Sequence, residues 1–314
     1  MANAERFARA LAAIDAANAQ DPTVVTVRGR EGPKELVHAD LVTDWIRALC
    51  RDPDEALMLA ARGHHFRRWT SPRATFPAGR AGYLRWRRAL QDQQARELGE
   101  LLAESGYETR TIERVQSLVR KQGLADPSDP DAQALEDALC LVFLETQLGD
   151  ITQRLDPDTL AGVLSKTAHK MSARGRRAIV DVPLDPGVRS LLDGALARDL
   201  VSQYLDGLRE HDWSSVAATL AADVERIGPY RDIYRGRDAY AGFLAETIDK
   251  LEGYELIVDR IVTQGTTIVV ELSETVDDDG ARLRTQEAVV FDVDAGAIIR
   301  VAVYLQTSER IPVS

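Results

Sequence analysis

The stretch AVVFDVDAGAIIRVAVY, residues 288–304, decides the fold of the second half of the chain. Alternation with a period of two runs through Thr285, Glu287, Val289, Phe291 and Val293, and a second apolar run follows the Asp-Ala-Gly turn at 294–296. Two such runs on either side of a short glycine-containing turn are typical of a β-hairpin. These residues therefore predict two adjacent antiparallel strands.

The pattern extends outward from this hairpin. Strands are expected at 254–264, 266–276, 284–294 and 297–307, with a further short strand at 223–228. Helical periodicity covers about 190–209, 213–221 and 237–250. Helices followed by a meander of strands predict an α+β domain in which a curved antiparallel sheet packs on helices.

The first 180 residues show almost only helical periodicity, which predicts an all-α domain. Helices are expected at about 4–19, 36–50, 54–63, 80–104, 109–122, 131–149 and 157–172. Asp54 and the pair Pro130-Asp131 are helix-start signals, and Gly106 and Gly123 are stop signals. Between residues 64 and 80 the chain is irregular and basic.

The charge of the chain changes between these two patterns. Residues 1–180 carry 26 Lys and Arg against 25 Asp and Glu, whereas residues 181–314 carry 13 against 25. The segment from Asp181 to Gly187 contains two prolines and a glycine, as expected of a linker or turn. We therefore predict a first domain at 1–180, a linker at 181–192 and a second domain at 193–314.

The composition of the 314 residues argues against several classes of function. A net charge of −11 opposes a broad nucleic-acid footprint, so nucleic acid is not expected as a partner. No apolar run approaches the ~18 residues that cross a bilayer, so no membrane partner is expected. Cys50 and Cys140 lie in apolar helical patterns, which favours buried thiols and a cytoplasmic location.

Three of the five histidines fall between residues 38 and 65. His38 shares a helical face with Val42 and Trp45, so its imidazole is expected to point into the core. His64 and His65 follow a short apolar helix, and two adjacent imidazoles at a buried helix end can both reach one ion. A core histidine bonded to a carbonyl and a chance surface pair remain the alternatives.

Two acids interrupt the stretch ALEDALCLVFL, residues 134–144, which is otherwise apolar on every face. A helix of this composition is expected to be buried all round. Because burying a bare carboxylate is costly, Glu136 or Asp137 should bind a metal or another cation. An arginine partner is the alternative to the metal.

The order of these residues resembles the HD superfamily of metal-dependent phosphohydrolases, whose pattern is one His, then His-Asp, then a distal Asp. His38, His64 and Asp137 match, and His65 stands where the family has its central Asp. The resemblance implies a divalent transition metal (Mn, Fe, Co, Ni or Zn) bound by His38, His64, His65 and Asp137. Glu136 and Asp137 are then the candidate catalytic acids, with Glu136 as a proton acceptor.

Residues 5–180 are also similar to an uncharacterised family, domain of unknown function 4202. The resemblance is carried by GHHFRRW at 63–69, FPAGRAGYLRWR at 76–87 and KTAHKMS at 166–172. It identifies a family but implies no activity.

Basic residues gather around the histidine pair and on the helix that follows it. Arg67, Arg68, Arg80 and Lys121 are the residues that we expect to bind phosphate. Guanidinium groups around a metal suit phosphoryl chemistry, because they neutralise the charge that develops on the phosphoryl oxygens. A solvated basic face is the alternative.

Residues 195–308 resemble the SnoaL-like, nuclear-transport-factor-2-type fold, a cone-shaped curved sheet on helices. The stretch RDIYRGRDAYAGFL at 231–244 and the terminal hairpin carry this resemblance. The superfamily includes isomerases, cyclases, dehydratases and ligand-binding or dimerising domains, so the fold alone does not choose an activity.

The candidates for lining the cone are polar or aromatic residues of the predicted strands, namely Tyr230, Tyr254, Glu271, Glu287 and Tyr304. A carboxylate whose pKa is raised by an apolar cone can act as a general base, with a tyrosine as oxyanion donor. A structural or surface role is the alternative for each residue. Alternation places Glu271 on the face opposite Val270 and Leu272.

These observations lead to three hypotheses. The first is a metal-dependent hydrolase that acts on a small phosphorylated or nucleotide-like substrate, with the second domain as an accessory. The second is a non-catalytic protein with a degenerate HD-like site that binds a ligand, with a homodimer formed through the C-terminal domain. The third is isomerase or hydrolase chemistry on a small molecule in the SnoaL-like domain.

Overall fold

The computed structural model describes residues 2–124, 126 and 128–311. The chain divides into two compact units. The first unit comprises Met1–Ile151 and His169–Pro183, and the second comprises Thr152–Ala168 and Leu184–Ser314. Residues 152–168, which the predicted boundaries place in the first domain, belong to the second unit in this division.

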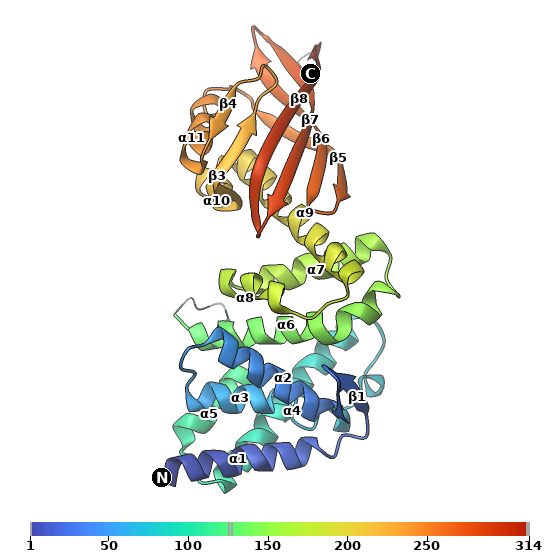
Figure 1. Ribbon diagram of the computed structural model, residues 1–314, viewed down its shortest axis with the longest axis vertical. Coiled ribbons are helices and arrows are strands. Elements are labelled where there is room, and N and C mark those ends of the chain that lie inside the picture. The colour runs from blue at the N-terminus through green and yellow to red at the C-terminus, as the bar shows by residue number, and fades with distance from the viewer. Residues whose placement is uncertain (1, 125, 127, 312–314) are drawn as a thin grey trace. The chain divides into compact units, whose positions relative to one another are not determined.

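Helices build the first unit, as predicted (Figure 1). They are α1 (Ala2–Asn18), α2 (Lys34–Leu49), α3 (Glu55–Gly63), α4 (Gly79–Glu104), α5 (Thr109–Val119), α6 (Pro130–Thr152) and α8 (Ala173–Ala178). Asp54 caps α3 by accepting a hydrogen bond from the Leu57 amide at 2.6 Å. The basic segment between α3 and α4 contains two short 3-10 turns, at Arg68–Thr70 and Arg73–Thr75.

The first unit also contains a β-hairpin that the all-α prediction missed. Strand β1 (Val24–Val27) pairs with β2 (Arg30–Pro33) across a two-residue turn, in which Arg28 and Gly29 both have positive φ. Four-residue strands are too short to establish a period of two beside long helical patterns. The hairpin leads directly into α2.

Helix α6 contributes many buried side chains to the first core. Leu135, Leu141, Val142 and Leu144 are each at most 2% exposed, which confirms that this helix is buried on several faces. Replacing one such leucine with alanine typically removes about 2–5 kcal/mol from the free energy of unfolding. Even so, neither α6 nor any other described helix is long and apolar enough to cross a membrane.

The second unit consists of helices and one six-stranded sheet. The helices are α7 (Pro157–Lys170), α9 (Pro186–Glu210), α10 (Trp213–Thr219) and α11 (Arg237–Ile248). The strands are β3 (Leu220–Ile227), β4 (Ile233–Arg235), β5 (Glu255–Gln264), β6 (Thr267–Asp278), β7 (Ala281–Asp294) and β8 (Ala297–Ile311). Asp185 caps α9, so this helix begins inside the segment predicted as a linker.

The order of the strands in the sheet is β4-β3-β8-β7-β6-β5. The terminal hairpin forms as predicted, with Asp294 opposite Ala297 across the turn. The sheet is mixed rather than wholly antiparallel, because β3 runs parallel to β8. The prediction missed this pairing because alternation shows which residues form strands but not which strands become neighbours. Three-residue β4 was also missed, since it is too short to show a period.

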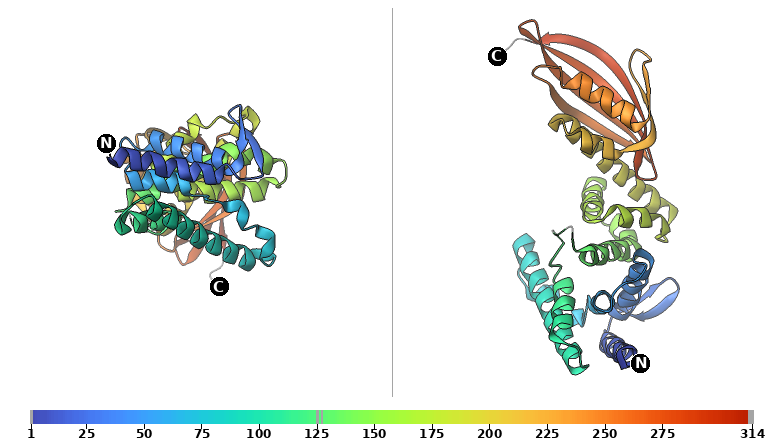
Figure 2. Two further views of the ribbon diagram at one scale, coloured as in Figure 1. Left: turned by 90° about the horizontal axis from the view of Figure 1, so that it is seen from below. Right: turned by 90° about the vertical axis from the view of Figure 1, so that its left-hand side faces the viewer.

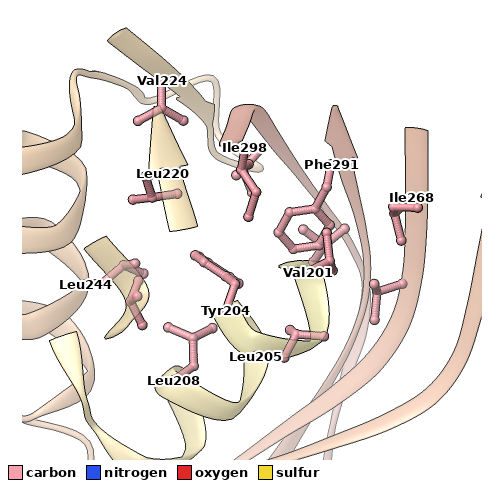
Figure 3. Packing of buried hydrophobic residues seen from close by; sticks show 14 of the residues in the cluster. Val201, Tyr204, Leu205, Leu208, Leu220, Val224, Leu244, Ile268, Phe291 and Ile298 are labelled. Atoms are coloured by element: carbon pink, nitrogen blue, oxygen red, sulfur yellow. The ribbon is translucent and has the colours of Figure 1, made fainter. Parts of the chain in front are cut away.

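The curved sheet and its helices enclose the core of the second unit (Figures 1 and 2). Figure 3 shows side chains of α9 pointing toward residues of β3, β7 and β8. The ring of Tyr204 meets that of Phe291 edge-on at 5.3 Å, and its hydroxyl lies 2.5 Å from that of Tyr240. The inward face of the predicted hairpin thus carries Phe291, as its alternation indicated.

Candidate functional site

Glu35 and His38 lie on the same face of α2, because residues three apart in a helix are neighbours. The local sequence positions this turn firmly. Asp21, just before the hairpin, accepts a hydrogen bond from the Glu35 amide at 3.1 Å and so satisfies an amide at the start of the helix. Glu35 is 3% exposed, so its carboxylate is held inside the unit.

The histidine pair leaves the end of α3 at a tightly packed point. A Cβ on Gly63 would lie 2.4 Å from a Leu98 methyl carbon, so only glycine allows α3 this close to α4. The Phe66 amide then bonds the Gly63 carbonyl at 3.0 Å, and the Phe66 ring is buried. This turn therefore holds His64 and His65 next to buried side chains of the first unit.

The structure brings the three predicted histidines together in one stack. The ring centroids of His38 and His65 are 4.0 Å apart, and those of His64 and His65 are 4.6 Å apart. His38 and His64 are 6.4 Å apart. The three imidazoles are therefore contiguous.

Glu35 joins this cluster, although the sequence analysis did not single it out. Its Oε2 lies 3.0 Å from Nδ1 of His65. Ligand atoms of Glu35, His38 and His65 all lie within 4.8 Å of one another, and no other group of this kind occurs among the described residues. The i, i+3 spacing of Glu35 and His38 is the sequence signal that could have found it.

Electrostatics keep the imidazoles of the cluster neutral. Burial lowers the pKa of His38, His64 and His65 well below the usual value, and neighbouring positive charges lower it further. Burial also raises the pKa of the Glu35 carboxyl. Neutral imidazole is the form that can bind a metal.

Arg68 determines the tautomer of His65. Its Nη1 lies 2.9 Å from Nε2 of His65, and a guanidinium can only donate. Nε2 must therefore accept, which leaves the proton on Nδ1, where it is donated to Glu35. In contrast, Nδ1 of His64 is buried with no hydrogen-bond partner among the described residues.

Asp137 points inward as predicted, at 3% exposure, but lies outside the cluster. Its carboxylate accepts hydrogen bonds from the Ser172 amide at 2.8 Å, from the Ser172 hydroxyl at 2.5 Å and from Gln133 at 2.9 Å. It also packs on Gly175, where a Cβ would lie 2.5 Å from the carboxylate carbon. The structure thus places Asp137 at the N-terminus of α8.

Glu136 is buried and forms an ion pair with Lys121. This pair lies near the cluster, because the charge of Lys121 acts on His64 and His65. Of the predicted phosphate-binding residues, Arg68 contacts the cluster through His65. Arg67 is instead 3.6 Å from Glu97, and Arg80 is exposed.

A second group of acids lies in the second unit. Tyr254 donates a hydrogen bond to Oε1 of Glu274 at 2.7 Å, and Glu274 in turn shares a hydrogen bond with Glu287. The two glutamates lie on the inward face of neighbouring strands, since Glu287 is opposite buried Leu272 and Glu274 follows Leu272 by two residues. Sequence reasoning missed Glu274, although its spacing from Leu272 was visible.

The two acids titrate abnormally. Burial, together with the charge of Glu274, raises the pKa of Glu287 to about 8, and burial raises the pKa of Glu274. The pair therefore retains one proton near neutral pH, because two neighbouring buried carboxyl groups do not readily both ionise.

The other predicted cone residues lie outside this group. Tyr230 is 85% exposed and Tyr304 is 55% exposed. Glu271 is exposed and lies 3.7 Å from Arg260, on the outer face of the sheet. The structure therefore brings together Tyr254 and Glu287 but not the remaining three.

The comparisons with known families cover most of the chain. The family described as "Domain of unknown function (DUF4202)" matches residues 8–192. The chain belongs to the DUF4202 family. A SnoaL-like domain follows at residues 201–301, so this DUF4202 protein also carries the second fold that the sequence indicated. Neither match bears on the HD superfamily, which stays a prediction.

Three solved structures illustrate what the DUF4202 protein is similar to. A ketosteroid isomerase candidate from Kribbella flavida DSM 17836 is 27% identical, over 39% of this chain and 86% of that one, with a TM-score of 0.34. An LEH-like epoxide hydrolase from M. tuberculosis is 24% identical, over 36% and 84%, with a TM-score of 0.33. An NTF-2 like protein of unknown function from Burkholderia xenovorans LB400 is 16% identical, over 38% and 91%, with a TM-score of 0.33. Among curated proteins, no relative matches.

Proposed function

We propose that the first unit is a metal-dependent hydrolase of a small phosphorylated substrate, with the ion bound by Glu35, His38 and His65. The observation that carries this proposal is the convergence of one buried carboxylate and two neutral imidazoles within 4.8 Å. Imidazole nitrogens and a carboxylate oxygen are the ligands that zinc and the neighbouring divalent transition metals take in proteins.

The surroundings of the cluster fit a cation better than a purely structural role. Buried polar groups are normally all hydrogen-bonded, yet Nδ1 of His64 has no partner among the described residues. Glu35 is buried with a raised pKa, and among the described residues its carboxylate contacts the neutral His65 ring, whereas Arg68 contacts the other nitrogen of that ring. A bound divalent ion would compensate the buried carboxylate and use the neutral imidazoles.

The residues around the cluster have distinct tasks in this proposal. When bound, such an ion would supply Lewis-acid activation of water and of a substrate oxygen. Glu35, His38 and His65 would hold the ion, and Arg68, which lies 2.9 Å from the His65 ring, would bind an oxygen of the anionic substrate. Glu136, which forms an ion pair with Lys121, would accept a proton.

Elemental analysis of the purified full chain tests this function. We expect about one divalent transition-metal ion per chain, little in Glu35→Gln and His38→Asn, and an unchanged content in the control variants Glu31→Gln and His211→Asn. Glu31 is exposed and His211 lies in the second unit, so neither touches the cluster. The loaded protein should release phosphate from a phosphomonoester. A chain that binds no ion from a panel of divalent metals contradicts the proposal.

The Glu274–Glu287 pair favours a second candidate function, isomerase or hydrolase chemistry on an apolar small molecule in the second unit. A carboxyl group that keeps its proton near neutral pH can act as a general acid, and its ionised partner can act as a base. Tyr254 would stabilise the charge that develops on the substrate. Glu287→Gln should abolish turnover of a model enolisable ketone or epoxide, whereas Glu271→Gln on the outer face should not. Equal activity in both variants contradicts this candidate.

A further inference from the structure

A basic pocket of about 520 Å³ lies in the first unit, between the middle of α4 and the end of α5. Arg87 and Arg88 of α4 and Arg120 and Lys121 after α5 all line it. Asp92 is the single acid of its lining, and it forms an ion pair with Arg120 at 3.2 Å. The lining thus carries an excess of positive charge that the described residues do not neutralise.

Two of these arginines are available to a ligand. The guanidinium groups of Arg87 and Arg88 have no ion-pair or hydrogen-bond partner among the residues that the structure describes. They are adjacent on α4 and share the pocket with Arg120. Guanidinium groups bind phosphate oxygens in a bidentate manner, so three of them around one pocket suit more than one phosphate group.

The backbone at Lys121 is unusual for a lysine. Lys121 has a φ of 59°, in the left-handed region, just after the end of α5. Glycine is the usual residue at such a helix end, because residues with a side chain are strained there. This strained backbone is understandable if the positive charge of the Lys121 side chain has a role at this position.

Lys121 joins the pocket to the metal-binding cluster. It lines the pocket and forms the ion pair with Glu136, and its positive charge acts on His64 and His65. A ligand held in the pocket would therefore extend toward the place where the proposed hydrolysis occurs.

We propose that this pocket binds an oligophosphate chain, such as that of a nucleoside di- or triphosphate or of inorganic polyphosphate. Arg87, Arg88 and Arg120 bind the oxygens of its distal phosphates, and Lys121 binds the phosphate nearest the cluster. The hydrolysed bond would then be a phosphate bond of that chain. This last step rests on the proposed function, whereas oligophosphate binding in the pocket does not.

Calorimetric titration of tripolyphosphate into the metal-depleted full chain tests the pocket directly. We expect one site per chain, binding tripolyphosphate more tightly than orthophosphate. The double variant Arg87→Gln/Arg88→Gln should weaken it about tenfold or more, which is about 1.4 kcal/mol, because it removes two charged hydrogen-bond donors from the pocket. The matched variant Arg85→Gln/Arg110→Gln removes two exposed charges outside the pocket and should change the affinity less than about twofold.

The same titration in Glu35→Gln separates this inference from the proposed function. Unchanged tripolyphosphate binding in a variant that has lost its metal supports a pocket independent of the cluster. Equal weakening by the two double variants, or no binding to a wild-type chain that does bind metal, overturns the inference. A chain that binds tripolyphosphate but no metal overturns only the hydrolase. Tighter binding of a nucleoside triphosphate than of tripolyphosphate would identify a nucleotide as the source of the phosphate chain.

Discussion

The carboxylate of Glu35 lies 3.0 Å from Nδ1 of His65, although 30 residues separate them in the chain. This contact joins the first turn of α2 to the segment after α3 and completes a group of three side chains of the types that can bind a metal. Because Arg68 occupies the other ring nitrogen, the imidazole is fixed in one tautomer from both sides. The geometry leads to predictions for each unit.

Removing the metal should lower the stability of the first unit. A ligand that binds only the folded chain stabilises it by about 4 kcal/mol at a thousand times its dissociation constant. We therefore expect thermal unfolding of the chelator-treated protein to shift upward on addition of zinc or manganese. The shift should vanish in His38→Asn and persist in His211→Asn. An equal shift in both variants would place the ion elsewhere.

Asp137 should prove to be a structural residue. Asp137→Ala removes the acceptor of three hydrogen bonds at the start of α8 and should cost about 1–3 kcal/mol in the free energy of unfolding. The metal content should stay unchanged, because Asp137 is not part of the Glu35 cluster. Loss of metal from a folded Asp137→Ala protein would restore Asp137 as a ligand.

Gly175→Ala tests the packing of the same carboxylate from the other side. The added methyl would lie 2.5 Å from the Asp137 carboxylate carbon, so we expect a loss of about 1–3 kcal/mol. In the Asp137→Ala background, Gly175→Ala should lower the free energy of unfolding much less, because the carboxylate that the added methyl would meet is no longer there. A double-mutant cycle by urea unfolding measures this coupling. Additive effects would show that the two residues do not touch.

The stability of the second unit should fall as the pH rises from about 5 to about 8. In the folded state the pKa of Glu287 is about 8, against 4.5 as the ordinary value. The folded unit therefore retains a proton that the unfolded chain releases, and this stabilisation is lost as the pH passes the folded pKa. Glu287→Gln should flatten the profile and be more stable than wild type above about pH 8, by about 1 kcal/mol or more.

Hydrogen exchange of β6 and β7 peptides across this pH range provides the measurement, after correction for the intrinsic dependence of exchange on pH. Glu271→Gln, which alters an exposed acid on the same strand as Glu274, is the control and should keep the wild-type profile. A Glu287→Gln profile parallel to wild type would show that Glu287 titrates as an ordinary exposed acid.

Tyr204→Phe should destabilise the second unit by about 1 kcal/mol, because it removes the hydrogen bond between the buried hydroxyls of Tyr204 and Tyr240. Tyr204→Ala should lower the free energy of unfolding by about 3–5 kcal/mol, since it also leaves a cavity beside the Phe291 ring. Urea unfolding of both variants gives the comparison. Equal losses would mean that the ring contributes nothing beyond its hydroxyl.

Much of the fold follows from periodicity in the sequence. The hairpin of β7 and β8 and the long helices α4 and α6 repeat their patterns over enough residues to be recognised. The short strands β1, β2 and β4 do not. The parallel pairing of β3 with β8 depends on contacts between distant segments, and no local pattern encodes it.

The candidate site was predictable only in part, for a related reason. The apolar pattern of α6 correctly directed Asp137 inward, because burial follows from periodicity, and the pattern of α2 put His38 beside the other two histidines. The hydrogen-bond partner of a buried polar side chain depends on which distant segment packs against it in the folded chain. Ser172 fills that place for Asp137, and Glu35 rather than Asp137 joins the histidines. Glu35 was missed because an acid in the first turn of a helix is also common on exposed surfaces.

The parallel neighbours β3 and β8 set the order in which the second unit can be completed during synthesis. Strand β3 ends at Ile227, whereas β8 begins only at Ala297, after α11 and three further long strands. A nascent chain therefore exposes one edge of β3 until its last strand has left the ribosome. Pairing between segments this far apart in the chain slows folding and leaves the backbone hydrogen-bonding groups of one β3 edge unpaired. Truncation within β8 should therefore cause aggregation rather than give a smaller stable domain.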